Sequence, residues 1–249
     1  MTRREPGVAL ARPTLDIGLF SDNPAMAAFY MNEIGLPFVE ALPHSETYSE
    51  NFYAANGASL KINASTEPME QGTSGYCALI IAREGVTAPQ QFVDPDGLSI
   101  AVVPPGHDGV HQMGIVCEVP DVSTERAFLI DAVGAYDDHG VLRIGETALF
   151  LQTGGVGRPT PTWRRGFNYY VVFVRDIGRA HQHLLDNGAE HSAPPLRLAE
   201  RCAFSWVRTP SGNWLELVQY ADYGALPDAP RAADRWPEII RWRETGEAF

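Results

Sequence analysis

Apolar residues occur in short runs along this chain, and the first run leads into a helix signal. Residues 15–21 predict a strand. Asp22 or Asn23 can cap a helix and Pro24 can occupy its first turn, so we expect a helix next. Gly35 is placed to end that helix. The apolar stripe of the helix consists of Met26, Phe29, Tyr30 and Ile34.

The same order of elements returns later in the chain. Three strands are expected after the first helix, which gives a βαβββ unit, and residues 114–152 and 168–219 repeat that order. Between the first and second full copies, residues 76–103 resemble a unit with a compressed middle that lacks a full helix. The sequence therefore predicts four modules. The other expected strands cover residues 38–42, 50–54, 59–63, 141–144, 147–152, 204–208 and 214–219, and the later helices cover residues 124–133 and 176–187.

Composition and charge narrow the class of protein. The 249 residues include 45% hydrophobic and 20% charged residues, which is typical of a folded globular chain. A net charge of −12 disfavours nucleic acid and anionic membranes as partners. We find no run of about 20 apolar residues and no secretory signal, and Cys77, Cys117 and Cys202 form no disulfide or zinc pattern. A cytoplasmic protein is the expectation.

Three motifs carry a resemblance to a known family. They are DNPAMAAFYMNEIGLPF at residues 22–38, Asp-Pro-Asp-Gly at 94–97 and TPSGNWLELVQ at 209–219. In this order and spacing they resemble the vicinal oxygen chelate superfamily, over about residues 14–221. That superfamily includes glyoxalase I, extradiol dioxygenases, bleomycin-binding resistance proteins and fosfomycin-modifying enzymes.

The resemblance implies an α+β fold in which tandem βαβββ modules form two cupped mixed β-sheets, with the helices packed outside. It implies an N-terminal domain over residues 14–104 and a C-terminal domain over residues 110–222, with a boundary near Pro104–Gly106. The tail, residues 223–249, carries an apolar stripe that we expect to dock on its own domain or on the partner of a homodimer.

The family's chemistry uses one divalent metal in a cup, held by residues at fixed positions of first and last strands. Iron, manganese, nickel and zinc are the candidate metals. Counting back from Asp22, Asp121 and Asp176 places the first-strand positions on residues that are not usual ligands. The last-strand position keeps a carboxylate only in the fourth module. In the first module that position holds Lys61, whose positive charge opposes a metal and suits an anionic ligand. The positions are Leu15, Tyr76, Gly114 and Tyr169 on first strands, and Lys61, Ala101, Phe150 and Glu216 on last strands.

Glu216 is the leading candidate for chemistry. It lies between Leu215 and Leu217 in an alternating strand, so its side chain is expected to enter the C-terminal cup as a metal ligand or general base. Glu118 either partners Glu216 in catalysis or is a solvated residue near a strand end. Because Tyr169 and Tyr170 point to opposite faces, one of them enters the cup.

Further candidates surround this site. Gln112 lies two residues before Gly114 and becomes a metal ligand if the register shifts, whereas His111 faces the other way and is the alternative ligand. Tyr169 is expected to act in catalysis. Tyr170, Asn168 and Phe150 are expected to contact substrate.

Two functional hypotheses remain open. The first is an enzyme that acts on a small oxygenated or aromatic molecule by lyase, isomerase or ring-opening chemistry. The second is a metal-free protein of the resistance type that sequesters a small molecule in an aromatic cup. The retained pocket carboxylate favours an enzyme, and the missing metal ligands favour a binding protein.

Overall fold

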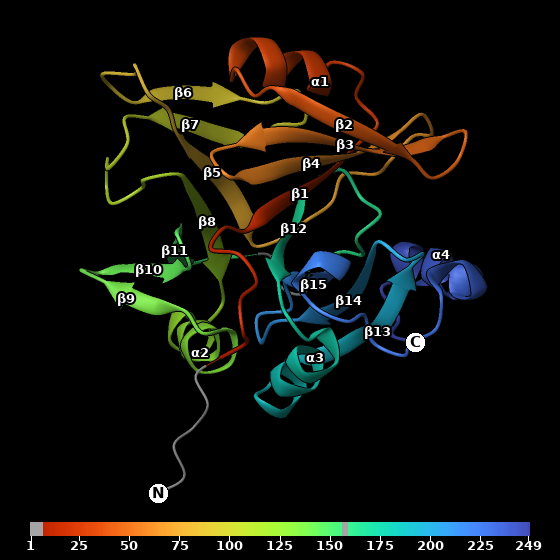
Figure 1. The fold of residues 1–249 in the computed structure, drawn as a ribbon. Coiled ribbons are helices and arrows are strands. Elements are labelled where there is room, and N and C mark those ends of the chain that lie inside the picture. Colours follow the sequence, from red (N-terminus) through yellow and green to blue (C-terminus); the bar gives the residue numbers. More distant parts are fainter. Residues whose placement is uncertain (1–6, 156–158) are drawn as a thin grey trace, which may run out of the picture.

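The computed structural model describes residues 7–155 and 159–249 and contains the four expected modules (Figure 1). The second module has a loop at residues 83–89 in place of a helix. The first module comprises β1 (Asp16–Ser21), α1 (Met26–Ala28), η1 (Phe29–Glu33), β2 (Phe38–Pro43), β3 (Tyr48–Ala55) and β4 (Ala58–Ser65). The second comprises β5 (Tyr76–Ala82), β6 (Gln90–Val93) and β7 (Ser99–Val103).

The third and fourth modules begin their helices at the aspartates that the sequence singles out. Asp121 accepts backbone hydrogen bonds from Ser123 and Thr124, and Asp176 accepts one from Arg179, so both are N-caps. The third module comprises β8 (Met113–Val119), α2 (Val122–Phe128), η2 (Leu129–Val133), β9 (Tyr136–Asp138), β10 (Val141–Ile144) and β11 (Thr147–Thr153). The fourth comprises β12 (Gly166–Phe173), α3 (Ile177–Asp186), β13 (Glu190–Leu198), β14 (Cys202–Arg208) and β15 (Trp214–Tyr220).

The strands form two mixed sheets, which confirms the expected fold class. The eight-stranded sheet has the order β13-β14-β15-β12-β1-β4-β3-β2, and the seven-stranded sheet has the order β6-β7-β5-β8-β11-β10-β9. In the first sheet β1 runs antiparallel to β12, and in the second β5 runs antiparallel to β8. The red β1 and the teal β12 accordingly lie side by side in the middle of Figure 1.

The expected pairing of consecutive modules is wrong. The first module shares its sheet with the fourth, and the second shares its sheet with the third, so neither 14–104 nor 110–222 coincides with one sheet. In all four modules the first strand is the one that pairs with another module. The alternation of apolar and polar residues is similar in these strands, so it does not determine which two modules pair. The C-terminal cup becomes a cup built from both ends of the chain.

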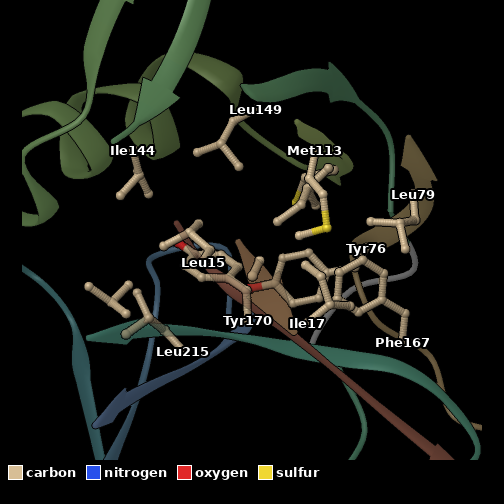
Figure 2. Close-up of a cluster of buried hydrophobic side chains, with 14 of the residues drawn as sticks. Leu15, Ile17, Tyr76, Leu79, Met113, Ile144, Leu149, Phe167, Tyr170 and Leu215 are labelled. Carbon is tan, nitrogen blue, oxygen red and sulfur yellow. The ribbon is translucent and has the colours of Figure 1, made fainter. Parts of the chain in front are cut away.

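The two sheets pack against each other through one apolar core. Side chains from the two sheets point toward one another in Figure 2, with Leu15, Tyr170 and Leu215 facing Met113 and Leu149. Residues of this core are almost inaccessible, since Leu215 is 0% exposed. Apolar residues of α1, α2 and α3 join the same core. These helices therefore do not cover the opposite, concave face of each sheet.

The concave face of the seven-stranded sheet is filled by the protein itself. Val110, from the loop after β7, is completely buried there and packs with Ala148 and Phe150. A Cβ on Gly114 would lie 3.1 Å from the Phe150 ring and 3.2 Å from Val110. Arg143 helps to hold the loop by donating to the carbonyl oxygen of Gly109. This face therefore has a structural role.

The tail lies over the concave face of the eight-stranded sheet. It contains η3 (Ala221–Tyr223), η4 (Ala232–Arg235) and α4 (Trp236–Thr245). The Trp242 ring lies 5.1 Å from that of Trp206 and 5.5 Å from that of Trp214, and its Nε1 donates to Ser192 Oγ at 2.7 Å. In the part of the chain that the structure describes, no helix is long and apolar enough to span a membrane.

Truncation of Trp242 tests this docking. We expect Trp242→Ala to lower the free energy of unfolding by about 3–5 kcal/mol, because the indole is 2% exposed and its removal leaves a cavity. Ile240→Ala is the control on the same helix; this side chain is 36% exposed, and the change should stay within about 0.5 kcal/mol. Urea unfolding measures both, and equal effects would contradict the packing of α4.

Candidate functional site

The concave face of the eight-stranded sheet contains a cavity, closed on one side by α4. Its volume is about 90 Å³, and β1, β3, β4, β12, β14 and β15 contribute residues to it. We call it the aromatic cavity because many of its lining residues are aromatic. These include Tyr169, Phe173, Phe204, Trp206, Trp236 and Trp242.

A buried ion pair forms the polar floor of the aromatic cavity. Lys61 Nζ on β4 lies 3.0 Å from Glu216 Oε2 on β15, and the residues are 7% and 6% exposed. Two strands, β1 and β12, separate β4 from β15, so the long lysine side chain spans the middle of the sheet. The pair thereby joins the first module to the fourth.

Gly18 makes this arrangement possible. It pairs with Lys61 on one side and with Tyr169 on the other, and a Cβ at Gly18 would lie 2.1 Å from the Tyr169 ring. Without that Cβ the ring lies across β1 toward β4, where Lys61 Nζ is 4.9 Å from the ring centroid. Asn63 Nδ2 donates to the Tyr169 hydroxyl at 3.1 Å.

The ionisable groups of the floor shift one another's pKa. Burial raises the pKa of Glu216, and this outweighs the opposing charge of Lys61. Burial would lower the pKa of Lys61, but the neighbouring charges, Glu216 foremost, raise it well above its usual range. The lysine therefore remains an ammonium ion at neutral pH.

Glu50 on β3 is a second carboxylate near the same ammonium. Burial opposes its ionisation, but the charge of Lys61 and the neighbouring His44 side chain outweigh burial and lower the pKa of Glu50 to about 2. The His44 Nε2 atom lies 3.5 Å from Glu50 Oε2, and the Tyr48 hydroxyl lies 3.2 Å from Glu50 Oε1. One ammonium thus faces two carboxylates whose pKa values shift in opposite directions.

Asp16 occupies the first-strand position that the sequence count assigns to Leu15. Asp16 lines the aromatic cavity, whereas Leu15 points into the core between the sheets. The count fails because Asn23, whose Oδ1 accepts from the Ala25 N–H, is the counterpart of Asp121 in this module, and Asp22 is not. Asp16 is already engaged by Arg12 and by the N–H of Ser59.

The predicted site residues divide between different parts of the molecule. Glu216 and Tyr169 meet in the aromatic cavity. Tyr170 points the other way, into the core between the sheets (Figure 2). Asn168 is buried and holds a loop by donating to the carbonyl oxygen of Thr162 at 2.8 Å.

The other predicted residues belong to the seven-stranded sheet or to its flanking loop. Glu118 accepts from Gln152 Nε2 at 3.0 Å and cannot partner Glu216, because the two lie on different sheets. Gln112 is bonded to Glu146, and His111 is exposed. Phe150 fills the concave face next to Val110. The proposed ligand set of Glu216, Gln112 and His111 is therefore not brought together.

The residues of the aromatic cavity do not fit a divalent metal. Its four ligand positions hold Asp16, Lys61, Tyr169 and Glu216, and an ammonium among them repels a cation. Within residues 7–155 and 159–249, no group of three or more His, Cys, Asp or Glu side chains could hold a metal ion. Lys61 supplies the positive charge at this place.

Sequence reasoning noted the charge of Lys61 but missed three other charged residues. Glu50 opens a predicted strand, and its alternation with Phe52 could have placed both on the cavity face. To predict Asp16, the first-strand position must be counted back from Asn23, which is the actual helix cap. Arg243 lies outside the repeat, and the apolar stripe of the tail predicts docking but does not indicate the face of the sheet on which α4 lies.

Comparisons with known proteins agree with this architecture. The family model described as Glyoxalase/Bleomycin resistance protein/Dioxygenase superfamily matches residues 19–217. Glyoxalase I from Zea mays is similar in structure, with a TM-score of 0.66 at 14% identity over 88% of this chain and 94% of that chain. No curated protein matches the sequence.

Two further solved structures share the fold. A putative dioxygenase from Bacillus subtilis has a TM-score of 0.64 at 11% identity, covering 94% of this chain and 95% of that chain. The cppA protein from Streptococcus pneumoniae has a TM-score of 0.51 at 10% identity, covering 86% of this chain and all of that chain. Identities this low show a common fold alone.

A double-mutant cycle tests the ion pair of the cavity floor. We expect Lys61→Met to lower the free energy of unfolding by about 3–5 kcal/mol, because it leaves buried carboxylates without their counter-charge. Adding Glu216→Gln should recover part of the loss. The double variant should therefore lose less unfolding free energy than the two single variants lose together. Strict additivity in urea unfolding at pH 7 would contradict the coupling.

The low pKa of Glu50 predicts a pH-dependent contribution to stability. A carboxyl group with a lowered folded-state pKa stabilises the fold above its unfolded pKa, and loses that effect as the pH falls toward about 2. The difference in unfolding free energy between wild type and Glu50→Gln should therefore shrink by about 2 kcal/mol from pH 7 to pH 3. The exposed change Glu46→Gln serves as control, and a difference that is constant with pH would contradict the shift.

Proposed function

Because the chain belongs to the glyoxalase/bleomycin resistance protein/dioxygenase superfamily, we propose that it binds a small aromatic or apolar oxygenated molecule in the aromatic cavity, without a divalent metal. The observation that carries this proposal is the buried Lys61–Glu216 pair, which places an ammonium among the residues of the expected metal position. The proposal favours the binding hypothesis over a metalloenzyme.

The walls of the cavity support an aromatic ligand. Tyr169 and Trp206 meet edge to face at 4.5 Å between ring centroids, and Trp206 also contacts Trp214 and Trp242. Each ring is held by its neighbours, so little side-chain freedom is lost when a ligand ring packs against them. Apolar contact therefore supplies affinity.

The floor supports a ligand with polar oxygens. Lys61 donates to Glu216 and keeps further N–H donors, and burial keeps the Tyr169 hydroxyl protonated by raising its pKa. A ligand carbonyl or hydroxyl oxygen placed over this floor would accept hydrogen bonds that apolar walls cannot offer. Orientation of the ligand follows from this contrast between floor and walls.

Metal-independent acid–base catalysis is the second candidate function. Carboxylates whose pKa values are driven apart suit the roles of acid and base, and here Glu216 is raised while Glu50 is lowered. In an enzyme of this kind Glu216 would move a proton and Lys61 would stabilise the oxyanion that forms. Glu216→Gln would then abolish turnover and leave ligand affinity within about twofold.

Metal analysis and a cavity variant test the proposal together. Protein purified without chelator or affinity tag should contain substoichiometric iron, manganese, nickel and zinc, in wild type and Glu216→Gln alike. The neutral one-ring probe benzamide should bind in calorimetry, with or without EDTA. Phe204→Ala should weaken this binding about tenfold, the equivalent of about 1.4 kcal/mol.

Phe92→Ala is the matched control, because Phe92 is also half-buried but lies on the seven-stranded sheet. It should leave the affinity for benzamide unchanged. A stoichiometric metal that disappears in Glu216→Gln, or equal binding by both phenylalanine variants, would overturn the proposal.

A further inference from the structure

Helix α4 lies outside the part of the chain that matches the family, yet it forms one wall of the aromatic cavity. The family match ends at residue 217, and α4 covers Trp236–Thr245. Four of its side chains line the cavity: Trp236, Ile239, Trp242 and Arg243. Three of them are apolar, so Arg243 is the polar group that this helix contributes.

Arg243 is surrounded by aromatic rings. Its guanidinium carbon lies 5.1 Å from the centroid of Tyr48 and 5.6 Å from the centroids of Trp163 and Trp236. The backbone fixes it as well, because the Trp163 N–H donates to the Arg243 carbonyl oxygen at 3.0 Å. Cation–π contacts hold the guanidinium in place and offer no acceptor in the plane of its N–H groups.

The Nη1 atom of Arg243 is buried and has no hydrogen-bond partner. A guanidinium carries five N–H donors, and a buried donor without an acceptor costs free energy. This cost disappears when an acceptor enters the cavity. A carboxylate is the best match, because its two oxygens accept from the guanidinium fork in one plane.

The other charges that line the cavity are already paired. Lys61 is paired with Glu216, and Arg201 with Glu40 at 2.9 Å. Asp16 is paired with Arg12, and Glu50 lies within 3.5 Å of His44. Among the residues that the structure describes, no carboxylate lies within ion-pair distance of Arg243.

We propose that Arg243 binds the anionic group of the ligand, and that the ligand is an aromatic carboxylate. The inference rests on the proposed function and narrows it to one substrate class. Glu50 and Glu216 disfavour an anion beside them, so the carboxylate lies at α4 and the ring lies against the aromatic wall. Selectivity for acids over neutral molecules therefore comes from a helix outside the repeat.

A matched pair of ligands tests this role. Benzoate and its neutral amide, benzamide, have nearly the same shape and differ in charge. By calorimetry we expect wild type to bind the acid at least about tenfold more tightly than the amide. Arg243→Met should weaken binding of the acid about 10- to 100-fold and leave the affinity for the amide within about twofold of wild type. Arg243→Lys should keep part of the preference because it keeps the charge.

Arg241→Met is the control on the same helix, since Arg241 is exposed, and it should change neither affinity. Circular dichroism and the unfolding midpoint verify that each variant folds. An amide that binds as tightly as the acid in wild type, or an acid preference that survives in Arg243→Met, overturns the role of Arg243 while the proposed function stands. If neither ligand binds to wild type, the proposed function fails and this inference fails with it.

Discussion

A buried ammonium ion can persist only beside a buried anion, and this constraint organises the molecule. Lys61 and Glu216 are 155 positions apart in the chain and 3.0 Å apart in space. Either charge alone would be costly inside the sheet, so the first module and the fourth are held in one register. Gly18 completes the arrangement by leaving room for the Tyr169 ring, whose centroid lies 4.9 Å from the Lys61 ammonium.

The two concave faces show how one repeat serves two purposes. In the seven-stranded sheet, Val110 and its neighbours close the hollow with apolar side chains. In the eight-stranded sheet, the hollow stays open below α4 and contains charged groups. The same supersecondary unit thus gives a face filled by apolar side chains in one half of the molecule and a cavity lined by charged and aromatic side chains in the other, according to which side chains its strands present.

The sequence predicted the elements of this fold better than their assembly. Strand alternation, the aspartate caps and the turn glycines are local signals, and they located all four modules and the missing helix of the second. The pairing of modules is decided by contacts between distant strands, such as β1 with β12, and the alternating pattern is the same for either choice. For the same reason the alternation places Glu216 and Tyr169 on one face of their sheet, but it cannot show that Glu118 lies on the other sheet.

Two other residues of the candidate site, Arg243 and Asp16, could not be predicted from the sequence for different reasons. Arg243 has no counterpart in the other modules, and its position depends on the docking of Trp242, which involves Ser192 on a distant strand. Asp16 depended on recognising Asn23 as the cap. Counting from Asp22 instead of Asn23 shifts the predicted position by one residue, from Asp16 in the cavity to Leu15 in the core.

The interleaved order of the modules also has a consequence for biosynthesis. The seven-stranded sheet draws on one contiguous stretch, from β5 to β11, and can assemble as soon as residues 76–153 have left the ribosome. The strands of the first module must wait for β12 to β15, so their central edge stays unpaired while about a hundred residues are synthesised. The nascent chain therefore completes the sheet with the aromatic cavity last, on a scaffold that the middle of the polypeptide has already built.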